Sequence, residues 1–87
     1  MLDVIDYKQN CFILIKVNII SNLNNLIKKI SRNLSEYTYK IYPLLGQYDL
    51  IIIIKMNILD VPNLILEKLT HIKEIESCET LFEVHSE

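Results

Sequence analysis

The chain has no tryptophan, a single glycine, two prolines and two cysteines among its 87 residues. The two cysteines, Cys11 and Cys78, lie far apart and form no C-x-x-C pair, so neither a zinc knuckle nor a thioredoxin-like redox pair is expected. The longest unbroken apolar run, residues 50–54, is too short to span a bilayer, and the acidic start of the sequence does not fit a secretion signal. These absences predict a cytoplasmic protein without a membrane segment.

The sequence also lacks the residue combinations on which catalysis and metal binding depend. Its possible nucleophiles and bases are scattered, without a supporting motif: Cys11, Cys78, His71 and His85. Glu67 and His71 are spaced for one face of a helix, but no third metal ligand accompanies them. We therefore predict no enzyme activity, no metal and no cofactor.

Size and charge set two further limits. With 87 residues, of which 51% are hydrophobic, the chain is expected to form one small globular domain. A domain of this size buries roughly 60% of its unfolded surface, so a monomer is marginally stable and self-association stabilises it. The formal net charge of −2 argues against direct binding to nucleic acid, which depends on cationic contacts to phosphate.

A β-hairpin around Gly46 is the firmest structural prediction. Glycine adopts positive φ without a Cβ penalty, so a tight turn is expected there. The strand after it, residues 48–56, is apolar on both faces, as is the stretch 11–17, and such strands are central in a sheet. The stretch 38–45 contains Pro43, which confines it to a sheet edge, and the alternating stretch 76–84 is suited to the other edge.

Two amphipathic helices are expected between these strands. Ser21 or Asn22 can cap the first, and its apolar stripe comprises Leu23, Leu26, Ile27, Ile30 and Leu34. Asp60 is the expected cap of the second, Pro62 lies in its first turn, and its apolar positions are Val61, Leu64, Ile65, Leu66, Leu69 and Ile72. The order of elements predicts an α+β fold, the ferredoxin-like βαββαβ plait, over residues 11–87, preceded by a leading arm, residues 1–10.

In this plait the four-stranded antiparallel sheet has the order 4-1-3-2, and right-handed crossovers put both helices on one face. The other face has no cover within the chain. Its expected residues form a contiguous apolar patch: Phe12, Leu14, Tyr42, Leu44, Ile51, Ile53 and Leu81. A soluble monomer rarely exposes such a patch, so we predict a homodimer that packs sheet against sheet, with roughly 800 Å² buried per chain.

Several of these residues resemble a known family. The run Gly46-Gln47-Tyr48-Asp49-Leu50-Ile51, then Asp60, residues 66–69, Ile75 and Thr80 look like the effector domain, or RAM domain, of the Lrp/AsnC transcription regulators. The most specific part is the G-x-Y-D turn before an aliphatic strand, and the likeness covers residues 11–84. Full-length regulators have an N-terminal helix-turn-helix domain, so the chain resembles a stand-alone form without it.

The resemblance implies a dimer, often assembled into a ring of four dimers, with a small amino-acid effector bound where dimers meet. On that basis the effector-binding candidates are Gly46, Gln47, Tyr48, Asp49 and Thr80. Gly46 would allow close backbone approach, and Asp49 would accept a charge-assisted hydrogen bond from an α-ammonium group. A purely structural role for residues 46–49 remains open.

The resulting interpretation is a non-enzymatic domain that senses an amino acid or related metabolite, oligomerises and modulates a transcription regulator without binding DNA. The main alternative is a pure assembly module that co-oligomerises with full-length Lrp/AsnC-type regulators and binds no ligand. A third is a small ferredoxin-like dimer with an unrelated cofactor or degradative role. Other families that share the plait fit less well, because the sequence lacks the glycine-rich anion loop of acylphosphatases and the aromatic central strands of RNA-recognition motifs.

Overall fold

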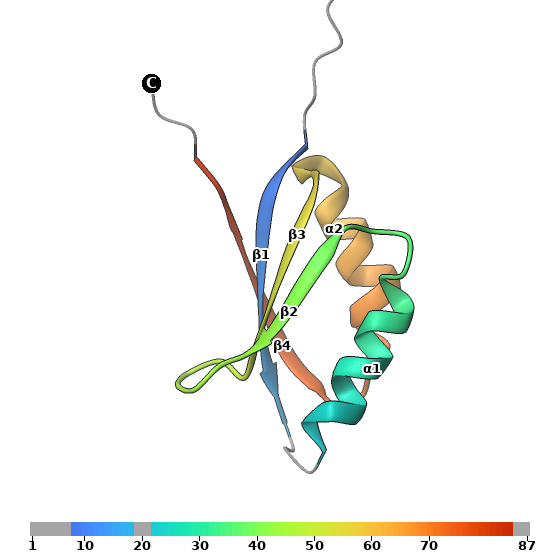
Figure 1. Ribbon diagram of the computed structural model, residues 1–87, viewed down its shortest axis with the longest axis vertical. Helices are drawn as coiled ribbons and strands as arrows, with labels where there is room; N and C mark the ends of the chain where they lie inside the picture. Colours follow the sequence, from blue (N-terminus) through green and yellow to red (C-terminus); the bar gives the residue numbers. More distant parts are fainter. Residues whose placement is uncertain (1–7, 19–21, 85–87) are drawn as a thin grey trace, which may run out of the picture.

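The computed structural model describes residues 8–18 and 22–84. Its four strands form one antiparallel sheet in the order β2-β3-β1-β4, with the helices on one side of it (Figure 1). The strands are β1 (Lys8–Val17), β2 (Tyr39–Pro43), β3 (Leu50–Asn57) and β4 (Ile75–Phe82). The predicted ferredoxin-like plait with the order 4-1-3-2 is therefore confirmed. Because β1 begins at Lys8, the sheet includes the last residues of the stretch expected to be a leading arm.

The core lies between the sheet and the helices. The central strands contribute to it through side chains that alternate between the two faces of the sheet. From Cys11 on β1, and along all of β3, every second residue is buried on the helix side: Cys11, Ile13, Ile15, Val17, Leu50, Ile52, Ile54 and Met56. Successive side chains alternate between the two faces of a strand, so the residues between them lie on the opposite side. The face assignment made from the sequence is correct for both strands.

Helix α1 (Leu23–Asn33) begins as the sequence predicts. The side chain of Asn22 accepts a hydrogen bond from the Asn25 N–H at 3.1 Å, which satisfies one of the free amides of the first turn. Leu26, Ile30 and Leu34 of its apolar stripe are buried against the sheet. The other proposed cap, Ser21, lies outside the described residues.

The second helical segment is less regular than predicted. A 3₁₀ turn (Ile58–Asp60) leads into α2 (Val61–Leu64) and then into a π-helical turn (Ile65–Leu69), closed by a Thr70 N–H bond to the Ile65 carbonyl at 3.0 Å. Leu66, predicted to be apolar core, is 60% exposed, whereas Leu64, Leu69 and Ile72 are buried as predicted.

The predicted cap of this segment is also wrong. Asp60 makes no capping hydrogen bond with its side chain, whereas the Asn57 side chain accepts one from the Leu59 N–H at 2.9 Å. The preceding 3₁₀ turn moves the true start of the helical segment upstream of Asp60. Pro62 lies in the first turn of α2, as expected. Among the described residues, no helix is long and apolar enough to cross a membrane.

The hairpin between β2 and β3 is confirmed, but its turn is longer than predicted. β2 ends at Pro43 and β3 begins at Leu50, so residues 44–49 form a loop, closed by a Leu44 N–H bond to the Asp49 carbonyl at 2.9 Å. Gly46 has φ +133°, in the region that favours glycine. The loop projects on the side of the sheet away from the helices (Figure 1).

Candidate functional site

The side of the sheet away from the helices, here called the open face, carries the apolar patch that the sequence predicts. The strand register places its residues in level rows. Ile53 and Phe12 are paired across β3 and β1, and so are Ile51 and Leu14. Tyr42 continues the second row onto β2, and Leu81 of β4 continues the first, so the patch runs across the whole sheet.

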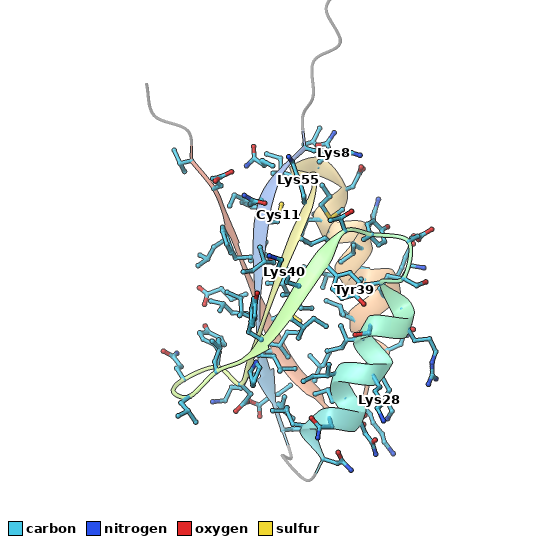
Figure 2. All side chains as sticks on the ribbon, viewed as in Figure 1. Lys8, Cys11, Lys28, Tyr39, Lys40 and Lys55 are labelled. Carbon is cyan, nitrogen blue, oxygen red and sulfur yellow. The ribbon has the colours of Figure 1, made fainter. Side chains whose placement is uncertain are left out.

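Exposure on the open face rises from the centre to the edges. The central side chains, Phe12, Leu14, Ile51 and Ile53, are half-buried by their neighbours. Tyr42 and Leu81 on the edge strands are 47% and 50% exposed. Leu44, predicted on the same strand face, lies instead in the loop after Pro43, because β2 ends earlier than expected. On β2, the neighbouring side chains of Tyr39 and Lys40 lie on opposite faces of the sheet. Tyr39 points toward α1 (Figure 2), and its hydroxyl donates a hydrogen bond to the Ser31 carbonyl at 3.3 Å.

The predicted effector loop is fixed to the end of β1 by its own acidic residue. The Asp49 carboxylate accepts a hydrogen bond from the Val17 N–H at 2.7 Å, and the Asp49 N–H donates to the Ile15 carbonyl at 2.8 Å. These bonds fall where β1 leaves its register with β4 between Lys16 and Val17. The carboxylate expected to receive an α-ammonium group therefore already serves a backbone amide.

A side-chain hydrogen bond also joins the loop to β4, at the opposite edge of the sheet. The Tyr48 hydroxyl donates a hydrogen bond to the Glu79 carboxylate of β4. This bond, followed by partial burial and the charge of Glu79, raises the pKa of Tyr48 above its usual value, so the tyrosine stays neutral and keeps its donor. Glu79 is a site residue that the sequence prediction missed. Its position on the open face in the alternating β4 was the available signal.

The tip of the loop is more accessible than its base. Gln47 is exposed, and its backbone carbonyl lies 3.5 Å from the Lys16 ammonium. A Cβ on Gly46 would have no neighbour within 4 Å, so the backbone there faces open space. Residues 46–48 thus present an accessible backbone held in place by Asp49 and Tyr48.

Thr80 does not join the other predicted effector residues within one chain. It pairs with the buried Ile13 and therefore lies on the helix side of β4, whereas Glu79 and the end of Tyr48 lie on the open face. The alternation of residues 76–84 already separated Thr80 from Glu79, but it did not show which face the loop would occupy.

The other polar candidates remain scattered. Cys11 is buried and Cys78 is half-buried, both are free thiols, and burial raises the pKa of each. His71 is exposed, and His85 lies outside the described residues. Within residues 8–18 and 22–84, no cluster of His, Cys, Asp and Glu is arranged to hold a metal ion.

A separate depression of about 500 Å³ lies at the other end of β3, between the loop after α1 and the start of α2. It contains both cationic and anionic side chains, among them Lys55, Asp60 and Glu67. None of the residues predicted to bind an effector lines it.

Comparison with known proteins gives the fold its context. No protein-family model and no curated protein matches the sequence. Among solved structures, AsnC of E. coli superposes with a TM-score of 0.77 at 26% identity, over 99% of this chain and 60% of AsnC. The chain is a structural relative of the Lrp/AsnC regulators. It spans about three-fifths of the AsnC chain.

Two smaller structures match over almost their full length. FFRP-DM1 has a TM-score of 0.71 and 23% identity over 87% of this chain and 99% of its own. TTHA0845 from Thermus thermophilus has a TM-score of 0.66 and 17% identity over 91% of this chain and 96% of its own. These two matches establish the shared fold. The AsnC match, at 26% identity, supports a domain related to transcription regulation.

Proposed function

We propose that this chain is a self-associating regulatory domain of the Lrp/AsnC type, which acts on transcription regulators through assembly and neither binds DNA nor catalyses a reaction. The observation that carries the proposal is the open face. Its apolar rows run over the two central strands and reach both edges, with half of Leu81 and nearly half of Tyr42 exposed. A single domain rarely exposes such an apolar surface to water, so a surface of another chain is expected to cover it.

Both edges of the open face favour a protein partner over a small ligand. Tyr42 and Leu81 are large apolar contact groups on an extended surface, as expected of an interface. The scattered thiols and histidine, and the raised thiol pKa values, give no support to a catalytic role. The formal net charge of −2 argues against binding to nucleic acid, because that affinity depends on cationic contacts to phosphate.

The test is subunit exchange with a full-length Lrp/AsnC-type regulator from the same source. Native mass spectrometry of a mixture should detect mixed oligomers, and the mixture should show altered DNA binding by the regulator. An Ile53→Lys variant places a charge at the centre of the open face and should neither exchange nor affect DNA binding. If the wild-type chain leaves the regulator unmixed and its DNA binding unchanged, the regulatory role is wrong.

Amino-acid sensing at residues 46–49 is the second candidate. The observation that favours it is the accessible backbone at Gly46 and the exposed Gln47, held at the end of an anchored loop. The ligand contacts would come from backbone groups at 46–48, from the Gln47 side chain and from the Asp49 carboxylate, of which one oxygen accepts from Val17 and the other can still accept. This arrangement would be completed by a neighbouring chain, since Thr80 lies on the other face of its own chain.

A thermal-unfolding panel with each common amino acid at millimolar concentration tests the sensing role. A ligand at about 100 times its Kd stabilises by about 2.7 kcal/mol, and each kcal/mol moves the Tm of a small domain by roughly 4–8 °C. Gln47→Ala should remove the shift for a true effector while leaving the unliganded Tm unchanged, because its side chain is exposed. A flat panel would leave assembly as the function.

A further inference from the structure

Much of the positive charge of the chain lies on the helix layer, on the opposite side of the sheet from the open face. Four of the nine Lys and Arg residues belong to α1 or to the loop before β4: Lys28, Lys29, Arg32 and Lys73. All of these except Lys28 line a depression of about 370 Å³ between the second half of α1 and residues 71–74. Among the described residues that line it, Glu74 is the one carboxylate. The depression is therefore cationic, although the formal net charge of the chain is −2.

The two walls of this depression are fixed to the rest of the fold. The Lys29 ammonium of α1 lies 2.6 Å from the Glu74 carboxylate, which joins one wall to the other. At the end of β1, the Asn18 side chain donates a hydrogen bond to the Lys73 carbonyl at 2.9 Å. The Asn18 N–H donates to the Glu74 carbonyl at 3.0 Å. The walls are thus held in place before any ligand binds, which lowers the entropy cost of binding.

Two cations of the depression have no counter-ion within the described part of the chain. Glu74 compensates Lys29, because the hydrogen bond from this ammonium lowers the pKa of Glu74 and keeps the carboxylate ionised at neutral pH. Arg32 and Lys73 form no ion pair with any residue that the structure describes. Both are exposed, as is His71, which lines the depression beside them. The depression therefore has two uncompensated positive charges.

We propose that this depression binds the phosphate group of a small phosphate monoester, with Arg32 and Lys73 as its contacts and His71 beside them. Such a phosphate carries a charge of about −1.5 to −2 at neutral pH, which matches the two uncompensated cations, whereas a carboxylate carries a single charge. The planar guanidinium of Arg32 can donate two parallel hydrogen bonds to phosphate oxygens. Lys73 supplies a compact positive charge with further donors.

The size of the site and the charge of the remaining sequence favour a small compound over a polyanion. The depression lies at the lower end of the range of roughly 300–1,000 Å³ that is typical of small-molecule sites. Apart from the four cations named above and Glu74, the sequence has ten acidic residues against five Lys and Arg. This surplus of negative charge disfavours a long nucleic acid, whose affinity depends on many cationic contacts. The site goes beyond the proposed function and does not depend on how the open face is covered.

Titration of the full chain with methyl phosphate, followed by two-dimensional heteronuclear NMR at constant ionic strength, tests the site. The backbone amide signals of residues 32–33 and 71–74 should shift and saturate. Acetate, which has a single charge, should bind much more weakly at the same residues. If methyl phosphate gives no saturable shifts there, or if acetate binds as tightly, the proposal is wrong.

Matched variants distinguish a defined site from a diffuse positive field. Arg32→Gln and Lys73→Gln should each raise the Kd for methyl phosphate roughly tenfold, because each removes a charge-assisted contact. Lys28→Gln removes the same charge from the same helix (Figure 2), but Lys28 does not line the depression, so the Kd should change less than about twofold. All three side chains are exposed, and circular dichroism verifies that the variants stay folded. An equal loss for Lys28→Gln overturns the site.

A short single-stranded oligonucleotide is the last probe. It should bind no more tightly than methyl phosphate. If the oligonucleotide binds at Arg32 and Lys73 while methyl phosphate does not, the surface is one for a polyanion and the proposal is overturned. None of these outcomes depends on the oligomeric state of the chain, so the phosphate site and the proposed function can fail independently.

Discussion

Replacing Leu81 by serine should weaken the proposed dimer while sparing the fold of each chain. Leu81 lies on the open face of the edge strand β4, is 50% exposed, and does not belong to the core between sheet and helices. Its remaining apolar surface is therefore available to a partner. A two-fold interface contains it twice, so the loss is counted for both copies.

The magnitude follows from this exposure. Full burial of a leucine side chain contributes roughly 1.5–3 kcal/mol, and half of that, about 0.7–1.5 kcal/mol per copy, is still to be gained by Leu81 on association. For two copies the loss is about 1.5–3 kcal/mol, which raises the dimer Kd roughly 10- to 150-fold.

Sedimentation equilibrium at several loading concentrations measures the Kd, and circular dichroism verifies that the variant stays folded. Leu66→Ser is the matched control, since Leu66 is 60% exposed but lies on the helix layer. An unchanged Kd for Leu81→Ser, or an equal loss for Leu66→Ser, would refute the assignment of the open face as the interface.

Three further predictions concern the loop. Gly46→Ala should lower the free energy of unfolding by about 1 kcal/mol, which lowers the Tm by roughly 4–8 °C. The reason is that φ +133° strains any residue with a Cβ, although no atom lies within 4 Å of the added Cβ. An unchanged Tm would show that the loop relaxes freely. Asp49→Ala should lower the free energy of unfolding, measured in urea, by about 1–3 kcal/mol, because the Val17 N–H loses its acceptor. Asp49→Asn keeps a side-chain oxygen and should lower this free energy by less. Equal losses for the two variants would contradict the hydrogen bond between Asp49 and Val17. In an ultraviolet titration Tyr48 should ionise at a higher pH than a free tyrosine, because its hydroxyl donates to Glu79. This hydrogen bond therefore stabilises the fold fully below the ordinary tyrosine pKa, and its contribution is lost as the pH rises through the raised pKa of Tyr48. Glu79→Gln should lower the pKa of Tyr48, and a Tyr48 pKa that does not respond to this substitution would refute the interaction between the two side chains.

The regular parts of the fold follow from local patterns that the sequence displays. Alternation in residues 11–17 and 50–56 identifies two faces for each central strand, and Pro43 confines β2 to an edge. Asn22 caps α1 because a short side-chain oxygen is available at the right position. Strand order then follows from the crossover rules, without reference to any single contact.

The errors arise where long-range contacts decide the local conformation. A tight turn at Gly46 was expected, yet the Asp49 bonds to Ile15 and Val17 hold residues 44–49 as a loop and remove Leu44 from the strand. The π turn over residues 65–69 has no marker in the helical periodicity. Likewise the Tyr48–Glu79 bond joins residues far apart in sequence, so neither residue alone signals it.

The central claim is that the open face is covered by a second copy of the chain. Sedimentation equilibrium of the unaltered chain over a wide micromolar range tests it most directly. The expected result is a species of twice the 10.3 kDa chain mass, or a multiple of that dimer, dissociating only at the lowest concentrations. A folded 10.3 kDa monomer at every concentration would contradict the claim.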